Sequence, residues 1–150
     1  MKDMIKMLDP TLKYERHDIV EDTIHIRVKS KRKILACPYC GEKSRKTHSK
    51  YHRTVQDLPM SGKKVYIEIE CRKMFCRNAD CNKKSFAEKI GFVGSKGKKS
   101  LRLEKEIINI AMNSSSVEAA KMLNRSTVKI SSGTVRNVLK KMEPPPSAEN

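Results

Sequence analysis

The sequence has no tryptophan, few aromatic residues and no long apolar run. Aromatic residues make up 5% of the 150 residues and hydrophobic residues 37%, so two modules would share little core material. A bound metal ion is one way in which small domains compensate for a thin core. No stretch approaches the ~18 apolar residues of a membrane span. We therefore expect no membrane protein, and either one ordinary domain or two very small ones.

We expect no export signal at the N-terminus. The first ten residues, MKDMIKMLDP, are interrupted by charges and Pro10, so they contain no apolar segment typical of a signal peptide. We therefore expect the five cysteines to lie in a reducing cytoplasm. There, metal binding or catalysis is a more common use of cysteine than a disulfide.

Acidic residues are too few to balance the basic ones. The sequence has 33 Lys and Arg against 17 Asp and Glu, which gives a net charge of +16 and a pI near 9.8. Solubility alone needs a net charge of only about 2 to 8 in a small domain. The excess predicts a polyanionic partner such as nucleic acid, with a merely solvated basic surface as the alternative.

Alternating apolar and polar residues predict β-strands from about residue 14 to residue 87. The stretches TIHIRVK and KVYIEIEC both alternate in this way, and we interpret them as half-buried antiparallel strands. A third extended piece, YHRTVQDLP, leads into a hairpin connection at Ser61-Gly62.

The string CPYCG, from Cys37 to Gly41, is typical of two different sites. Cys-Pro-Tyr-Cys occurs in glutaredoxin-like oxidoreductases, where the first cysteine begins a long helix. Here it is followed by EKSRKTHSKYHR, which has almost no apolar residue for a buried helical stripe. The sequence therefore lacks the helix that a redox site of this kind requires.

A second cysteine pair favours a metal site instead. Cys76 and Cys81 form a C-x4-C pair at the end of a predicted strand, whereas Cys37 and Cys40 form a C-x2-C pair. Four thiolates suit a tetrahedral zinc ion, and a closed four-ligand shell is structural rather than catalytic. Gly41 allows the positive φ that turns backbone N–H groups toward sulfur.

Three other residues are rival ligands. Cys71 lies in step with the apolar side of its predicted strand, so we interpret it as a small core residue. His48 and His52 can in principle replace a thiolate, but neither has a partner at ligand spacing.

After residue 100 the spacing of the apolar residues becomes that of an amphipathic helix. The pattern predicts helices over 101–113, over 116–124 with Ser115 and Glu118 at capping-box spacing, and from Ser131 or Ser132 to about Met142. Three short helices of this kind are typical of a helix-turn-helix, with a plain three-helix bundle as the alternative.

The third helix would present its polar arc to DNA. Arg136 and Asn137 suit guanine and adenine edges, whereas Ser, Thr and Lys side chains suit phosphates. The residues that we expect at DNA are Ser131, Ser132, Thr134, Arg136, Asn137 and Lys140 of this helix and Lys96, Lys98 and Lys99 before the first helix.

The predicted fold class is α+β, a small antiparallel β zinc ribbon followed by a three-helix helix-turn-helix domain. The segment IGFVGSKGKKS contains three glycines and three lysines, which is typical of a flexible linker. The expected organisation is a β-rich zinc ribbon over 1–89, a flexible linker over 90–100, a helix-turn-helix over 101–143 and a Pro-rich tail over 144–150.

These motifs resemble a known family. The strings CPYCG, YHRTVQDLPMSGKKVYIEIECRKMFCRNADC and KSFAE resemble the N-terminal zinc ribbon of the ISL-three group of bacterial insertion-sequence transposases, and the helical region is similar to the helix-turn-helix that follows it. The resemblance implies that Cys37, Cys40, Cys76 and Cys81 hold one structural zinc ion. It also implies binding to the terminal inverted repeats of the element, in a bacterial cytoplasm and at the nucleoid.

Transposases of this group continue into a nuclease domain with an Asp, Asp, Glu triad that holds two divalent ions, whereas this sequence stops after EPPPSAEN. We assign no catalytic residue and expect no enzyme, but either the DNA-binding part of a transposase or a shortened relative. The expected partner is double-stranded DNA, and a homodimer is possible on this sequence. The alternatives are a zinc-ribbon transcriptional regulator, a thiol-disulfide oxidoreductase and a protein-binding adaptor.

Overall fold

The protein has an α+β fold in which strands predominate. The structure, a computed structural model, describes residues 1–94, 97–112, 115–125 and 132–140, so the predicted tail lies outside the described residues. The strands are β1 (Leu12–Val20), β2 (Thr23–Ser30), β3 (Leu35–Ala36), β4 (Lys43–Ser44), β5 (Thr47–Met60), β6 (Lys63–Phe75) and β7 (Ser85–Ala87). The helices are α1 (Lys2–Leu8), α2 (Leu101–Ala111), α3 (Ser116–Arg125) and α4 (Ser132–Lys140). None of the described helices is long and apolar enough to cross a membrane.

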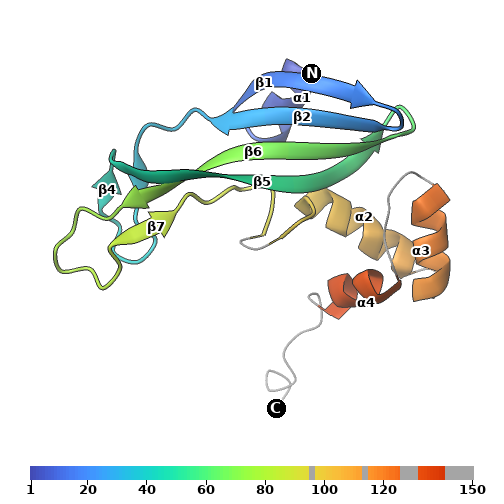
Figure 1. The fold of residues 1–150 in the computed structure, drawn as a ribbon. Coiled ribbons are helices and arrows are strands. Elements are labelled where there is room, and N and C mark those ends of the chain that lie inside the picture. Colours follow the sequence, from blue (N-terminus) through green and yellow to red (C-terminus); the bar gives the residue numbers. More distant parts are fainter. Residues whose placement is uncertain (95–96, 113–114, 126–131, 141–150) are drawn as a thin grey trace, which may run out of the picture.

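The main sheet has the strand order β1-β2-β6-β5, with β7 also paired to β6. The short strands β3 and β4 form a separate two-stranded sheet. Figure 1 shows β4 and β7 at one end of the long β5–β6 hairpin, whereas α2, α3 and α4 gather below the sheet nearer its other end. The hairpin turns at Ser61 and Gly62, both with positive φ (51° and 72°), as the sequence predicts.

The pairing of β2 with β6 is parallel, so the prediction of a wholly antiparallel sheet is wrong. The register aligns Ile24 with Val65, Ile26 with Ile67 and Val28 with Ile69. Alternation places side chains on one face of a strand, but it carries no information about strand direction. The chain between β2 and β6 returns through the β3–β4 hairpin and β5, which makes the parallel pairing possible.

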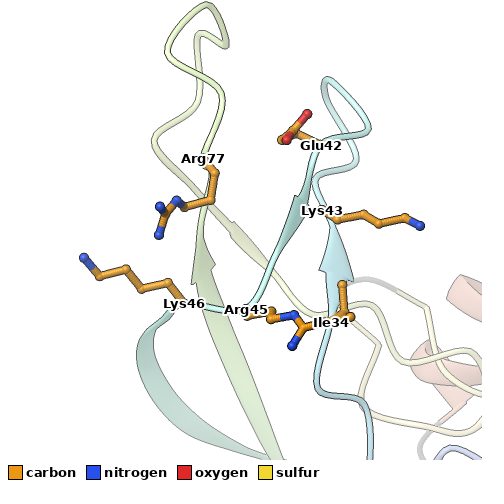
Figure 2. Close-up of a pocket in the computed structure, with 6 residues that line it drawn as sticks. All are labelled: Ile34, Glu42, Lys43, Arg45, Lys46 and Arg77. Atoms are coloured by element: carbon orange, nitrogen blue, oxygen red, sulfur yellow. The ribbon is translucent and has the colours of Figure 1, made fainter.

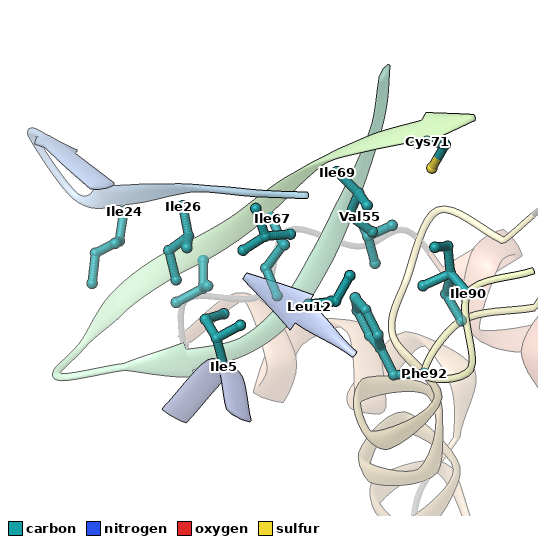
Figure 3. Close-up of a cluster of buried hydrophobic side chains, with 13 residues drawn as sticks. Ile5, Leu12, Ile24, Ile26, Val55, Ile67, Ile69, Cys71, Ile90 and Phe92 are labelled. Atoms are coloured by element: carbon teal, nitrogen blue, oxygen red, sulfur yellow. The ribbon is translucent and has the colours of Figure 1, made fainter. Parts of the chain in front are cut away.

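The largest core lies on the inner face of this sheet (Figure 3). Alternate residues of β2, β5 and β6 point into it, and Cys71 is fully buried among them, which confirms that it is a core residue. Helix α1, which packs Ile5 onto this core, was not predicted from the sequence. Its signal was present, because Met1, Met4, Ile5 and Leu8 have helical spacing.

The segment 90–100 is packed against the sheet in its described parts, so the prediction of a free linker is wrong there. Ile90, Phe92 and Val93 belong to the main core (Figure 3 labels the first two). The backbone N–H of Gln56 donates to the carbonyl of Lys98 at 2.8 Å, and the N–H of Ser100 donates to the carbonyl of Gln56 at 2.9 Å. The burial of three apolar side chains and this backbone pairing hold the segment on the sheet, although its glycines and lysines are typical of a flexible linker.

The three C-terminal helices surround a second core. Its buried members are Leu103, Ile107, Ala111, Ala119, Ala120, Val135 and Val138. The helix bounds agree with the predicted ranges within two residues, except that the predicted end near Met142 lies outside the described residues. The N–H of Glu118 donates to the Ser115 hydroxyl at 3.1 Å, which confirms the predicted cap of α3. Leu58 of β5 packs against this core and thus connects it to the sheet.

Candidate metal centre

The β3–β4 hairpin builds the first cysteine knuckle. The N–H of Cys37 donates to the carbonyl of Glu42 at 2.9 Å, and the N–H of Gly41 donates to the carbonyl of Cys37 at 2.8 Å. Gly41 has φ +82°, the left-handed conformation that the sequence predicts. This turn directs the N–H of Glu42 to the sulfur of Cys40.

The second knuckle connects β6 to β7. The N–H of Cys76 donates to the carbonyl of Lys84 at 2.8 Å, which closes the loop, and the N–H of Cys81 donates to the carbonyl of Asn78 at 3.1 Å. Backbone N–H groups of Asn78 and Lys83 point to the sulfurs of Cys76 and Cys81. Each of these donors lies two residues after its cysteine, the same spacing as in the first knuckle.

The two knuckles bring four sulfur atoms together. The sulfurs of Cys37, Cys40, Cys76 and Cys81 all lie within 4.8 Å of one another. The Cys40 and Cys76 sulfurs are 3.6 Å apart. A tetrahedron with Zn–S bonds of ~2.3 Å places its sulfurs about 3.8 Å apart, so the spacing fits zinc. The four cysteines form the site of one structural zinc ion, with no position left for a substrate.

The electrostatics of the four thiols also favour a bound cation. The backbone N–H of Glu42 holds the pKa of Cys40 down to about 7, well below the usual thiol range. At Cys76, the N–H of Asn78 acts in the same direction, but desolvation and the three neighbouring sulfurs raise the pKa to about 12. The sulfurs therefore cannot all ionise together unless a cation binds between them.

Asn78 is a part of the site that the sequence analysis missed. Its side chain approaches the sulfur of Cys40 in the opposite knuckle and, after the larger effect of the Glu42 N–H, helps to lower the pKa of that thiol. Its Oδ1 also accepts from the N–H of Asp80 at 3.0 Å, which shapes the loop. An asparagine inside a short cysteine loop is a usable signal, because Asn favours turns of this kind.

The rival ligands lie away from the sulfurs. Within the described residues, no group of three or more ligand side chains other than the four cysteines is close enough to hold a metal ion. Cys71 is buried in the main core. His48 packs its ring on Phe75, with centroids 4.7 Å apart, and its Nδ1 is 3.0 Å from the Ser49 hydroxyl.

The residues predicted at DNA do not lie at the metal centre. Arg136, Asn137 and Lys140 are exposed on α4, and Ser132 and Thr134 are half-buried near its start. Lys98 is exposed, whereas Lys99 is half-buried and forms a β-bridge with Gln56. Lys96 and Ser131 lie outside the described residues.

The comparison with known families bears on the metal centre. Residues 35–81 match the family described as the zinc-finger of transposase IS204/IS1001/IS1096/IS1165. This segment contains all four clustered cysteines, but none of α1, α2, α3 and α4. No curated protein and no solved structure matches the chain. The match supports a zinc ribbon of the ISL-three transposase type, as the sequence resemblance implies.

Proposed function

We propose that this chain binds double-stranded DNA at the terminal inverted repeats of an insertion sequence, as the DNA-binding part of a transposase. The observation that carries the proposal is the four-cysteine segment, which has the geometry of a zinc site and matches the transposase zinc finger. A closed tetrathiolate zinc site stabilises a fold without performing chemistry. The proposal therefore gives these 150 residues a binding role and assigns strand cleavage to none of them.

The charge of the chain supports a nucleic acid partner. A net charge of +16 on 150 residues is well above what solubility needs, and phosphate neutralisation is the main source of affinity in protein–DNA complexes. Lys98 adds an exposed cation on a backbone that is hydrogen-bonded to β5. In this proposal Lys96, Lys98 and Lys99 contact phosphates.

In this proposal the helical region recognises the DNA sequence, as a helix-turn-helix does. Val135 and Val138 are buried against α2 and α3, so Arg136 and Asn137 face solvent. Arg and Asn form bidentate hydrogen bonds with guanine and adenine edges in the major groove. In the same orientation Ser131, Ser132, Thr134 and Lys140 contact the phosphates that flank these bases.

The test is a selection of bound duplexes from a random pool by the zinc-loaded full chain. We expect one enriched sequence, with affinity that falls steeply as salt increases. The same selection with Cys76→Ser, which removes one zinc ligand, should enrich that sequence weakly. A pool that stays random would contradict the assignment of specific DNA binding.

A further inference from the structure

A basic cleft lies beside the metal centre, where the sequence analysis placed no DNA contact. It is an open hollow of about 890 Å³ between the β3–β4 hairpin and the loop after β6. Its lining residues are Ile34, Glu42, Lys43, Arg45, Lys46 and Arg77. Figure 2 shows Lys46 and Arg77 extending to the same side of the cleft, one from the β4–β5 connection and the other from the loop after β6.

The four cations of this cleft are only partly balanced by the negative charges around them. All four are exposed, and none takes part in an ion pair among the described residues. Glu42 supplies the one carboxylate of the lining. A zinc tetrathiolate carries two net negative charges, so the four cations, Glu42 and the zinc site together leave a net charge of about +1.

The backbone that carries three of these cations, Lys43, Lys46 and Arg77, is held in place. The N–H of Phe75 donates to the carbonyl of Lys46 at 2.9 Å, and the Nζ of Lys46 lies 5.3 Å from the centre of the Phe75 ring. Arg77 directly follows the zinc ligand Cys76. Lys43 pairs with Ala36 in the hairpin that carries the other two ligands. Zinc binding therefore fixes the positions from which these side chains extend.

We propose that this cleft binds the phosphate backbone of the same DNA duplex that α4 reads. This inference rests on the proposed function. Arg and Lys are the usual phosphate-binding side chains, and an open cleft admits a continuous strand. The lining contains no aromatic side chain on which a base could stack, which favours a backbone contact over a bound nucleotide or a single strand.

The geometry places this contact at a distance from α4. Leu58 touches the helical core, and Lys46 precedes β5, so most of the length of β5 separates the two sites. About twelve residues of strand at ~3.3 Å each span about 40 Å, close to one turn of B-DNA. The cleft therefore contacts phosphates about one helical turn away from the bases at α4.

The experiment uses the zinc-loaded full chain with both Lys46→Gln and Arg77→Gln. Its matched control carries Lys6→Gln and Lys13→Gln, which remove two exposed charges from α1 and β1. Each is titrated at several salt concentrations on a selected duplex of about 40 base pairs and on a scrambled duplex. Zinc content shows whether each variant keeps the ribbon, and Lys46→Arg with Arg77→Lys tests for rescue by charge.

We expect the cleft variant to bind both duplexes roughly tenfold more weakly, with a salt slope lower by about two units, and the charge-preserving variant to recover most of the loss. Hydroxyl-radical protection should shrink by about one turn on one side of the site. The inference is overturned if the cleft variant binds as the control does, or if it loses affinity for the selected duplex alone. Wild-type protein that binds no duplex would instead overturn the proposed function itself.

Discussion

Asp57 of β5 and Arg102 of α2 form a bidentate ion pair that joins the sheet to the helical region. Arg102 donates from Nε to Oδ1 of Asp57 at 2.7 Å and from Nη2 to Oδ2, and the Ser100 hydroxyl donates to the same Oδ1 at 2.7 Å. The Asp57 carboxylate is buried, and its hydrogen bonds to Arg102 raise the pKa of the guanidinium. Because Ser100 also caps α2 through the N–H of Leu103, these contacts fix the start of α2 against the sheet.

Arg102→Ala should destabilise the chain by about 2 to 3 kcal/mol. The substitution leaves the buried Asp57 carboxylate with the Ser100 hydroxyl as its remaining side-chain partner, and an uncompensated buried charge is costly. Urea unfolding of the zinc-loaded protein, followed by circular dichroism, measures the loss.

Arg27→Ala is the matched control. Its partner Glu68 is 3.2 Å away, but both side chains are more than one third exposed, so this pair should contribute less than about 1 kcal/mol. Equal losses in the two variants would show that the Asp57–Arg102 pair does not hold the helices to the sheet.

The zinc ligands are tested by two cysteine substitutions on neighbouring parts of the chain. Cys76→Ser removes a member of the sulfur cluster and should abolish stoichiometric zinc binding, whereas Cys71→Ser alters the core and should keep one zinc per chain. Metal content after gel filtration gives the answer. Zinc retained by Cys76→Ser and lost by Cys71→Ser would mean that Cys71 is a ligand.

The burial of the Cys71 thiol also predicts that the stability of the chain depends on pH. Burial raises the pKa of the Cys71 thiol to about 11, from an ordinary value of 9.0. Because the folded state favours the neutral thiol, this contribution is complete below pH 9 and is lost as the pH rises toward 11. The stability difference between wild type and Cys71→Ala should therefore shrink from pH 8 to pH 10 in urea titrations. A difference that is constant over this range would contradict the burial of the thiol.

Gly41 should tolerate no side chain without loss of zinc affinity. At φ +82° an alanine is strained by about 1 kcal/mol, although no atom lies within 4 Å of the added Cβ. The strain acts on the turn that aims the Glu42 N–H at Cys40, so Gly41→Ala should weaken zinc binding in a chelator competition. Gly91→Ala is the control, because Gly91 also has open space but no positive φ. Similar zinc affinity in both variants would show that this turn does not depend on glycine.

Local patterns in the sequence were sufficient to predict most of the metal centre. The cysteine spacing, the glycine after Cys40 and the alternation of β5 and β6 are local signals, and they predict both knuckles and the long hairpin. The helices are predicted for the same reason, since the cap at Ser115 and the apolar spacing of each helix are also local signals.

Contacts between distant segments were not predictable in this way. Asp57 and Arg102 are polar residues in separate segments, and nothing local indicates that they pair. The parallel alignment of β2 with β6 depends on the path of the chain between these two strands. The alternation of apolar and polar residues carries no information about that path. The segment after Ile90 has apolar residues between its glycines, and its burial depends on the face of the sheet that they meet.

The most direct test of specific DNA binding compares wild type and Arg136→Ala on selected and scrambled duplexes, each titrated with salt. If α4 reads bases, Arg136→Ala should cost about 1 to 3 kcal/mol on the selected duplex and almost nothing on the scrambled one, with the same pattern for Asn137→Ala. Lys105→Ala, an exposed charge removed from α2, is the control and should leave the preference unchanged. If Arg136→Ala weakens both duplexes equally, α4 does not read the sequence and the account of specific DNA binding by this helix is contradicted.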